Sequence, residues 1–165
     1  FADYQNDLNN FREKELSDIK KYLDSKNIAA QKVNNSVYVV MEKEGTGRSA
    51  DSGLMVGVKY SGKNFEGKYF DSNVDSTKQT MAHPLEIFYF VSKREGAIQG
   101  MLESITSFKV GSKGTLYIPS SLAYGPQGSM PVIKPYENLI FEIEVVEVKE
   151  APKDQQPGMP PGGGY

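Results

Sequence analysis

Alternation of apolar and polar residues is the feature of this sequence that most limits its fold. A period of two is typical of a β-strand with one buried face. The longest such run covers residues 138–149, where the apolar positions are Leu139, Phe141, Ile143 and Val145. Shorter runs of this kind, bounded by turn residues, lie at residues 37–41, 55–60, 85–91 and 115–118. In the run 85–91 the expected buried positions are Leu85, Ile87, Tyr89 and Val91. The sequence therefore predicts about five strands.

One segment has the period of a helix instead. Its apolar residues fall within an arc of about 120° on a helical projection, and they are Met101, Leu102, Ile105 and Phe108. Gly111 stands where a helix C-cap is expected. Several strands and one short helix indicate an α+β domain, in which an antiparallel sheet wraps on the helix.

The first 27 residues also have a helical pattern, with no glycine or proline among them. Their apolar side chains fall within an arc of about 140°, and they are Tyr4, Leu8, Phe11, Leu16, Ile19, Tyr22 and Leu23. We therefore expect an amphipathic helical extension over residues 1–32. Three interpretations stay open: the helix packs on its own domain, it is a dimerisation arm, or it is a spacer from a membrane anchor.

Proline and glycine dominate the last 15 of the 165 residues. Such a segment cannot bury a core, so residues 151–165 are expected to form a flexible tail. The folded domain would then span residues 33–150. Because the sequence begins with Phe1 instead of Met, we expect an upstream segment to have been removed.

Composition excludes several classes of protein. The net charge is −2, whereas a nucleic-acid-binding protein needs a basic surface. With no cysteine and one histidine, the chain offers no disulfide framework and no Cys/His zinc site, and we expect no metal and no cofactor. The absence of cysteine is compatible with an oxidising compartment.

Three short motifs suggest chemistry but lack its structural context. Residues 57–64 nearly match a phosphate-binding P-loop, but the last position is Asn64 instead of Ser or Thr. Ser17 and Lys20 have the spacing of a nucleophile pair without its partner motifs. The single histidine, His83, is expected to have a surface or capping role.

Six segments in order resemble the FK506-binding (FKBP) family of peptidyl-prolyl isomerases. They are residues 58–62 (VKYSG), 69–72 (YFDS), 97–101 (AIQGM), 110–113 (VGSK), 118–125 (IPSSLAYG) and 139–144 (LIFEIE). The resemblance covers about residues 36–149 and implies a bent antiparallel sheet around one short helix. It also implies that the chain accelerates rotation about X–Pro bonds in polypeptides.

That activity explains why no nucleophile or metal is needed. The rotation barrier of a peptide bond is about 18–20 kcal/mol, and no covalent bond is broken in crossing it. The twisted amide is less polar than the planar one, so an apolar pocket favours it. Lowering the barrier by about 4 kcal/mol accelerates exchange about a thousandfold.

The resemblance also implies which residues form the pocket. The expected catalytic residues are Tyr60, Phe70, Asp71, Ile98, Tyr124 and Phe141. The expected substrate-binding residues are Leu85, Ala97, Met101 and Ile133. The backbone N–H of Ile98 and the hydroxyl of Tyr124 would donate hydrogen bonds to substrate carbonyls, and Asp71 would orient its neighbours.

Three positions depart from the family pattern. Met101 stands where tryptophan is usual, Leu85 where an aromatic is usual, and Ala97 where a larger aliphatic is usual. We therefore expect reduced catalytic efficiency and weak binding of macrolides such as FK506. The alternative function is a non-catalytic protein-binding or chaperone module on the same fold. The helical extension resembles those of bacterial extracytoplasmic members, so we expect an extracytoplasmic location, free or anchored at the membrane.

Overall fold

The structure is a computed structural model that describes residues 2–152. Most of the predicted tail, residues 153–165, lies outside the described residues. The helices are α1 (Ala2–Ser25) and α2 (Gln99–Ser104), with single 3₁₀ turns η1 (Ser76–Lys78), η2 (Ile105–Ser107) and η3 (Ser120–Leu122). The strands are β1 (Gln31–Val33), β2 (Val37–Lys43), β3 (Met55–Asn64), β4 (Tyr69–Ser72), β5 (Phe88–Val91), β6 (Lys113–Ile118) and β7 (Leu139–Lys149).

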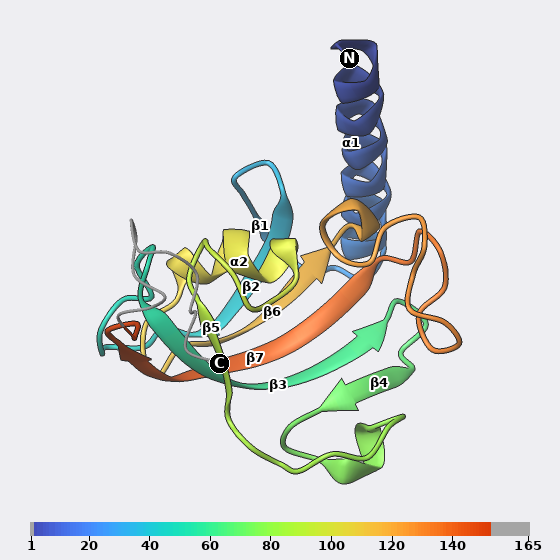
Figure 1. Cartoon of the computed structure of the whole chain (residues 1–165). Coiled ribbons are helices and arrows are strands. Elements are labelled where there is room, and N and C mark those ends of the chain that lie inside the picture. The colour runs from blue at the N-terminus through green and yellow to red at the C-terminus, as the bar shows by residue number, and fades with distance from the viewer. Residues whose placement is uncertain (1, 153–165) are drawn as a thin grey trace.

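One bent antiparallel sheet holds all seven strands, in the order β1-β2-β6-β7-β3-β4, with β5 also paired to β3 (Figure 1). The two strands beyond the expected five, β1 and β4, have three and four residues, too few to show a period in sequence. Strand β3 pairs with β5 through residues 55–58 and with β4 through residues 61–63. The segment 73–87 therefore leaves the sheet between these two partners, as Figure 1 shows.

The predicted strand at residues 85–91 begins three residues later than expected, at Phe88. Leu85 is 52% exposed, whereas Phe90 and Val91 are both buried, so the predicted alternation was wrong there. The reason is a side chain outside the run. The amide of Asn73 donates to the carbonyl oxygens of Val58 and Glu86, at 2.9 and 2.8 Å, and this holds the residues before Phe88 as a loop.

The predicted helical stripe is confirmed, because Met101, Leu102, Ile105 and Phe108 are all buried. The predicted C-cap was wrong. Helix α2 ends at Ser104 and continues as the 3₁₀ turn η2. Gly111 has φ +94° in the following turn, and its N–H donates to the carbonyl oxygen of Val145 at 2.9 Å. Glycine suits that turn because its φ is positive.

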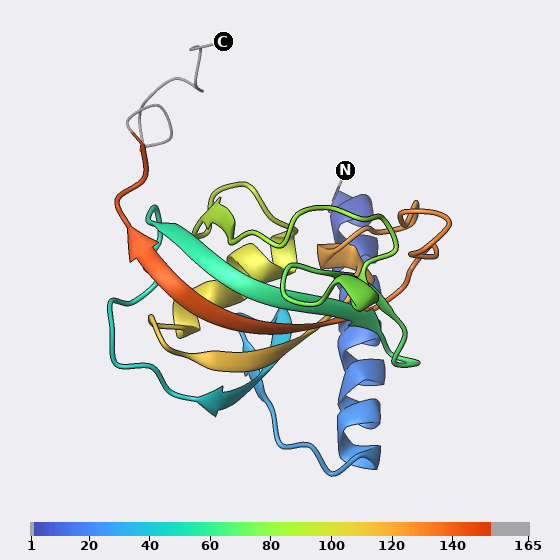
Figure 2. The same ribbon diagram turned by 90° about the horizontal axis from the view of Figure 1, so that it is seen from below.

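The sheet carries a separate apolar cluster on each face, because alternate residues of the same strands point to opposite sides. The larger cluster contains α2 and residues such as Leu116 of β6 and Phe141 of β7. The neighbouring residues Tyr117 and Ile140 belong to the second cluster, which α1 covers. Figures 1 and 2 show α2 lying along the first face.

The second half of α1 packs on the domain, as the first interpretation predicts. Leu16, Ile19 and Leu23 are each at most 3% exposed. The first turns extend beyond the rest of the fold (Figure 1). Leu8 is 44% exposed, whereas Phe11 is 36% exposed and meets the ring of Tyr136. Neither α1 nor any other helix within residues 2–152 has the length and apolar character needed to cross a membrane.

Candidate functional site

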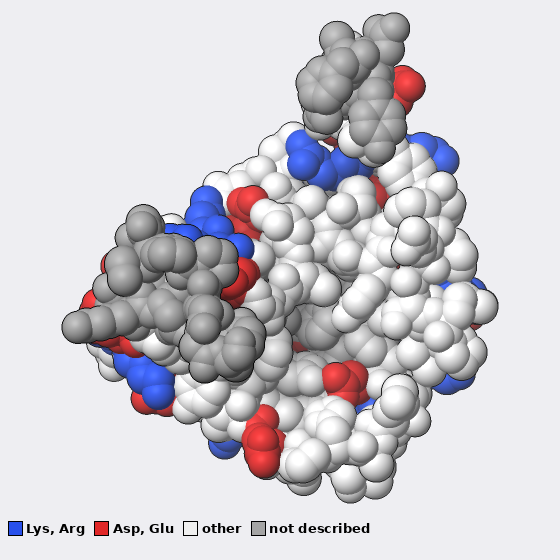
Figure 3. Space-filling view, viewed as in Figure 1, with Lys and Arg blue, Asp and Glu red and all other residues white. Residues whose placement is uncertain are grey.

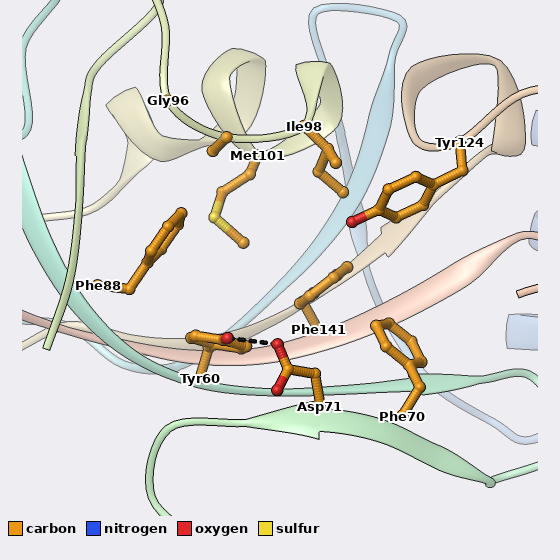
Figure 4. Close-up of a pocket in the computed structure, with 10 residues that line it drawn as sticks. Tyr60, Phe70, Asp71, Phe88, Gly96, Ile98, Met101, Tyr124 and Phe141 are labelled. Carbon is orange, nitrogen blue, oxygen red and sulfur yellow. Dashed lines mark hydrogen bonds between the residues drawn. The ribbon is translucent and has the colours of Figure 1, made fainter. Parts of the chain in front are cut away.

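A cavity of about 440 Å³ opens on the concave face of the sheet, beneath α2. Figure 3 shows a hollow on this side of the molecule, surrounded mainly by uncharged residues. The cavity is formed by side chains from four strands, from α2 and from two loops (Figure 4). The lining residues are Tyr60, Phe70, Asp71, Phe88, Gly96, Ala97, Ile98, Met101, Tyr124 and Phe141.

Aromatic rings form most of the cavity wall. The rings of Phe70 and Phe141 meet edge to face, with centroids 5.7 Å apart and planes at 83°. Tyr60 and Phe88 meet in the same way, at 5.7 Å and 65°. Edge-to-face contacts add to the stability gained from burial. The wall is therefore apolar, and its rings support one another.

A glycine makes room for two of these rings. Gly62 of β3 lies opposite Phe141 of β7 and Asp71 of β4 in the sheet. A Cβ atom at position 62 would lie 2.7 Å from Phe70 Cζ and 2.8 Å from Phe141 Cε1. A side chain at this position would displace one or both rings from their present places in the wall.

Asp71 is the only carboxylate among the lining residues. Its Oδ2 accepts a hydrogen bond from the Tyr60 hydroxyl at 2.6 Å (Figure 4). Its Oδ1 accepts one from the Ser72 N–H at 2.9 Å. Burial, followed by this contact with Asp71, raises the pKa of Tyr60 well above its ordinary value of 10.0. Tyr60 therefore stays protonated and fixes the carboxylate at the cavity edge.

Two hydrogen-bond donors remain available to a ligand. Burial, followed by the nearby Asp71 charge, raises the pKa of Tyr124 above 10.0, so its hydroxyl stays protonated at neutral pH. Figure 4 shows this hydroxyl directed into the cavity. The backbone N–H of Ile98, just before α2, donates no hydrogen bond within residues 2–152. Together they can hold two carbonyl oxygens beside an apolar group.

His83 is exposed, as the sequence predicts, and it also contacts the cavity-lining residue Asp71. Its Nε2 is 2.6 Å from Asp71 Oδ1, and its Nδ1 is 3.0 Å from the carbonyl oxygen of Pro84. These two partners are acceptors, so only the doubly protonated ring donates to both, although the Gln79 amide nitrogen also lies 3.4 Å from Nδ1. The hydrogen bond to Asp71, followed by that to Pro84, raises the pKa of His83 above 6.5. Sequence reasoning missed this contact because the two residues lie 12 positions apart across an irregular loop.

We expect an NMR titration to place the pKa of His83 above 6.5, and Asp71→Asn to lower it. Because the folded-state pKa is raised, the pair stabilises the fold fully below pH 6.5. This contribution is lost as the pH rises through the higher folded value. The chain has a single histidine, so its ring signals need no further assignment. An unshifted pKa in the wild-type protein would contradict the contact.

The structure brings eight of the ten predicted site residues to the cavity, and two lie elsewhere. Leu85 is exposed on the loop before β5. Ile133 is 3% exposed and packs in the main core instead of lining the cavity. Phe88 and Gly96 also line the cavity, although the sequence did not predict them there. The aromatic run 88–90 was the available signal for Phe88, which supplies the aromatic group expected at Leu85.

The other motifs do not form sites. The P-loop-like residues 57–64 lie inside β3, with no helix after them. Lys20 pairs with Asp24 on α1 at 2.5 Å instead of with a nucleophile. Within residues 2–152, no group of three or more His, Cys, Asp or Glu side chains is placed to hold a metal ion.

Comparison with known proteins agrees with this geometry. Residues 46–146 match the family model described as FKBP-type peptidyl-prolyl cis-trans isomerase. The chain belongs to this family. The match contains every residue that lines the cavity and all of β3 to β6, so the resemblance carried by the six sequence segments is confirmed.

Two relatives show how much of this FKBP-type chain is shared. FkpA of Escherichia coli K12 is 37% identical over 117 residues, which is 71% of this chain and 39% of that protein. FK506-binding protein 4 of Dictyostelium discoideum is 41% identical over 102 residues, which is 62% of this chain and 25% of that protein. The chain therefore spans well under half the length of these relatives.

Solved structures of this family share the fold. The crystal structure of FkpA from Escherichia coli has a TM-score of 0.68 at 27% identity, covering 90% of this chain and 65% of that one. A peptidyl-prolyl cis-trans isomerase from Pseudomonas syringae has a TM-score of 0.66 at 25% identity, covering 84% and 96%. The α+β fold expected from the sequence is confirmed.

Proposed function

We propose that this chain is a peptidyl-prolyl cis-trans isomerase acting on X–Pro bonds in polypeptides. The observation that carries the proposal is the aromatic cavity of about 440 Å³ with two free donors at its edge. A proline ring fits an apolar wall, and the twisted amide is favoured where water is excluded. Membership of the FKBP family supports the same conclusion.

We assign the roles as follows. Tyr60, Phe70, Phe88 and Phe141 surround the proline ring, with Met101 on the cavity floor and Ala97 at its side. The Ile98 N–H and the Tyr124 hydroxyl bind substrate carbonyls on either side of the rotating bond. Asp71 orients Tyr60 and His83. These interactions favour the twisted amide over both planar isomers, which lowers the barrier.

The test is cis-trans exchange in short X–Pro peptides, measured by NMR exchange spectroscopy with and without the protein. We expect catalytic acceleration that is lost in Phe70→Ala while the fold persists. A folded protein without acceleration would contradict the proposal and favour the non-catalytic binding module. Peptides that differ in the residue before proline would show how Ala97 and Met101 affect substrate choice.

Because Met101 lies at the cavity floor, we expect a larger side chain there to raise both catalytic efficiency and ligand affinity. Met101→Trp should raise kcat/KM and the affinity for a macrolide such as FK506 by about three- to tenfold, the range expected for added aromatic contacts. Met101 is 2% exposed, so the new ring has to extend into the cavity and cannot turn toward solvent. Met81→Trp, at an 81% exposed position, is the control. A well-folded Met101→Trp protein with no gain in either quantity would contradict this explanation.

We further propose that the partners are proline-containing polypeptides and that the chain works outside the cytoplasm. The lack of cysteine and the resemblance of the N-terminal helix to extensions of bacterial extracytoplasmic members support this location. Dimerisation through α1 and anchoring through an upstream segment stay predictions. The domain boundaries at residues 32/33 and 150/151 also stay predictions, to be tested by limited proteolysis.

A further inference from the structure

One carboxylate of α1 is directed into the protein rather than toward solvent. Glu15 is 5% exposed. Its Oε1 accepts a hydrogen bond from the Ser121 N–H at 3.1 Å, and its Oε2 accepts one from the Ser120 hydroxyl. Within residues 2–152, Glu15 forms no ion pair. A buried carboxylate is costly unless hydrogen-bonded, so these two contacts hold it in place.

The residues that Glu15 holds begin the segment that carries Tyr124. Ser120 opens the turn η3, and the preceding Pro119 makes no side-chain cap. The carbonyl oxygen of Ser120 accepts hydrogen bonds from the Ala123 and Gly125 N–H groups, at 2.9 and 2.8 Å. Tyr124 lies between these two donors. Its position in the cavity therefore depends on Ser120, which is fully buried.

Helix α1 also contacts the far end of the same segment. The Tyr136 N–H donates to the Gly125 carbonyl oxygen at 2.9 Å, closing the loop that follows Tyr124. The Tyr136 ring meets the ring of Phe11 edge to face, with centroids 5.2 Å apart. Figure 1 shows this loop lying beside α1. The helix therefore supports both ends of a loop whose first turn reaches the cavity.

We propose that Glu15 is a positioning residue for the isomerase site, acting through Ser120 and Ser121 on Tyr124. This rests on the proposed function. The N-terminal helix lies on the face of the sheet opposite α2, yet it sets where one of the two substrate donors stands. A donor must be held within about 0.5 Å of its productive position, so a loosened turn weakens transition-state binding.

The experiment compares Glu15→Ala with Glu13→Ala, a matched change of an exposed carboxylate on the same helix. At a temperature where both proteins are folded, Glu15→Ala should lower kcat/KM about fivefold, within the range for coupling through packed networks. Glu13→Ala should leave it unchanged. Glu15→Gln should keep most of the kcat/KM that Glu15→Ala loses. The glutamine amide can accept a hydrogen bond from the Ser121 N–H and donate one to the Ser120 hydroxyl.

A double-mutant cycle separates positioning from general destabilisation. In a Tyr124→Phe background, Glu15→Ala should lower kcat/KM by less than about twofold, because the hydroxyl that Glu15 positions is absent. An equal loss in both backgrounds, or wild-type activity in Glu15→Ala, would overturn the proposal. If Glu15→Ala fails to fold, Ser120→Ala removes one of the two hydrogen bonds and should give a smaller loss of the same kind.

A measurement that does not depend on catalysis tests this proposal separately from the proposed function. The ring NMR signals of Tyr124 should shift in Glu15→Ala and stay unchanged in Glu13→Ala. An inactive wild-type protein with this shift would reject the isomerase function and retain the link between Glu15 and Tyr124. An active protein without the shift would reject the link and retain the function.

Discussion

Replacing Asp71 with leucine should lower kcat/KM for an X–Pro peptide by about tenfold or more, equivalent to about 1.4 kcal/mol of transition-state stabilisation. The carboxylate accepts hydrogen bonds from the Tyr60 hydroxyl, the Ser72 N–H and the His83 ring. Leucine has a similar size but accepts none of them. The Tyr60 hydroxyl would then lose its partner inside a largely apolar cavity, and the ring would no longer be held against the proline.

Asp51→Leu is the matched control, because Asp51 is an exposed carboxylate outside the cavity. Its kcat/KM should equal that of the wild-type protein. Tyr60→Phe removes one of the three hydrogen bonds and should give an intermediate loss. Full activity in a folded Asp71→Leu protein would show that the carboxylate is not needed to organise the site.

Replacing Phe108 with alanine should lower the free energy of unfolding by about 3–5 kcal/mol. Phe108 is fully buried at the end of η2 and belongs to the main core. Its ring lies against Gly114 of β6, where a Cβ atom would be 3.1 Å from Phe108 Cζ. Because this glycine has no side chain to move, little can fill the cavity that alanine leaves. Domains are typically stable by about 5–15 kcal/mol, so the loss would be a large fraction of the total.

Urea denaturation measures this loss as a shift of the midpoint by about 2 M, for an m-value of about 2 kcal/mol/M. Met81→Ala, at an 81% exposed position, should change the free energy by less than about 0.5 kcal/mol. A shift in Phe108→Ala no larger than in Met81→Ala would mean that the core closes around the missing ring.

Periodic patterns in the sequence were enough to predict the parts of the fold that repeat along the chain. The period of two in residues 139–145 assigned alternate side chains to opposite faces, and the structure places Phe141 and Ile140 in different clusters. The helical stripe that includes Met101 and Phe108 predicted the single helix inside the domain. Such periods can be seen in the sequence because a strand or helix with one buried face needs apolar residues at regular intervals.

The candidate site was accessible from the sequence only through segments that the family shares. The segments 69–72 and 118–125 located Phe70, Asp71 and Tyr124, all of which line the cavity. The irregular segment 73–87 gave no such guide. Strand pairing sets where β5 begins, so the aromatic position was assigned to Leu85 instead of Phe88.

Contacts between groups far apart in the chain could not be predicted from sequence patterns. Glu15 and Ser120 lie 105 positions apart, and the contact of His83 with Asp71 depends on how an irregular loop folds back. Ile133 packs into the core, although sequence alone could not distinguish it from a cavity residue. A hydrogen bond between distant segments leaves no period in the chain, because its geometry exists only after the sheet has formed.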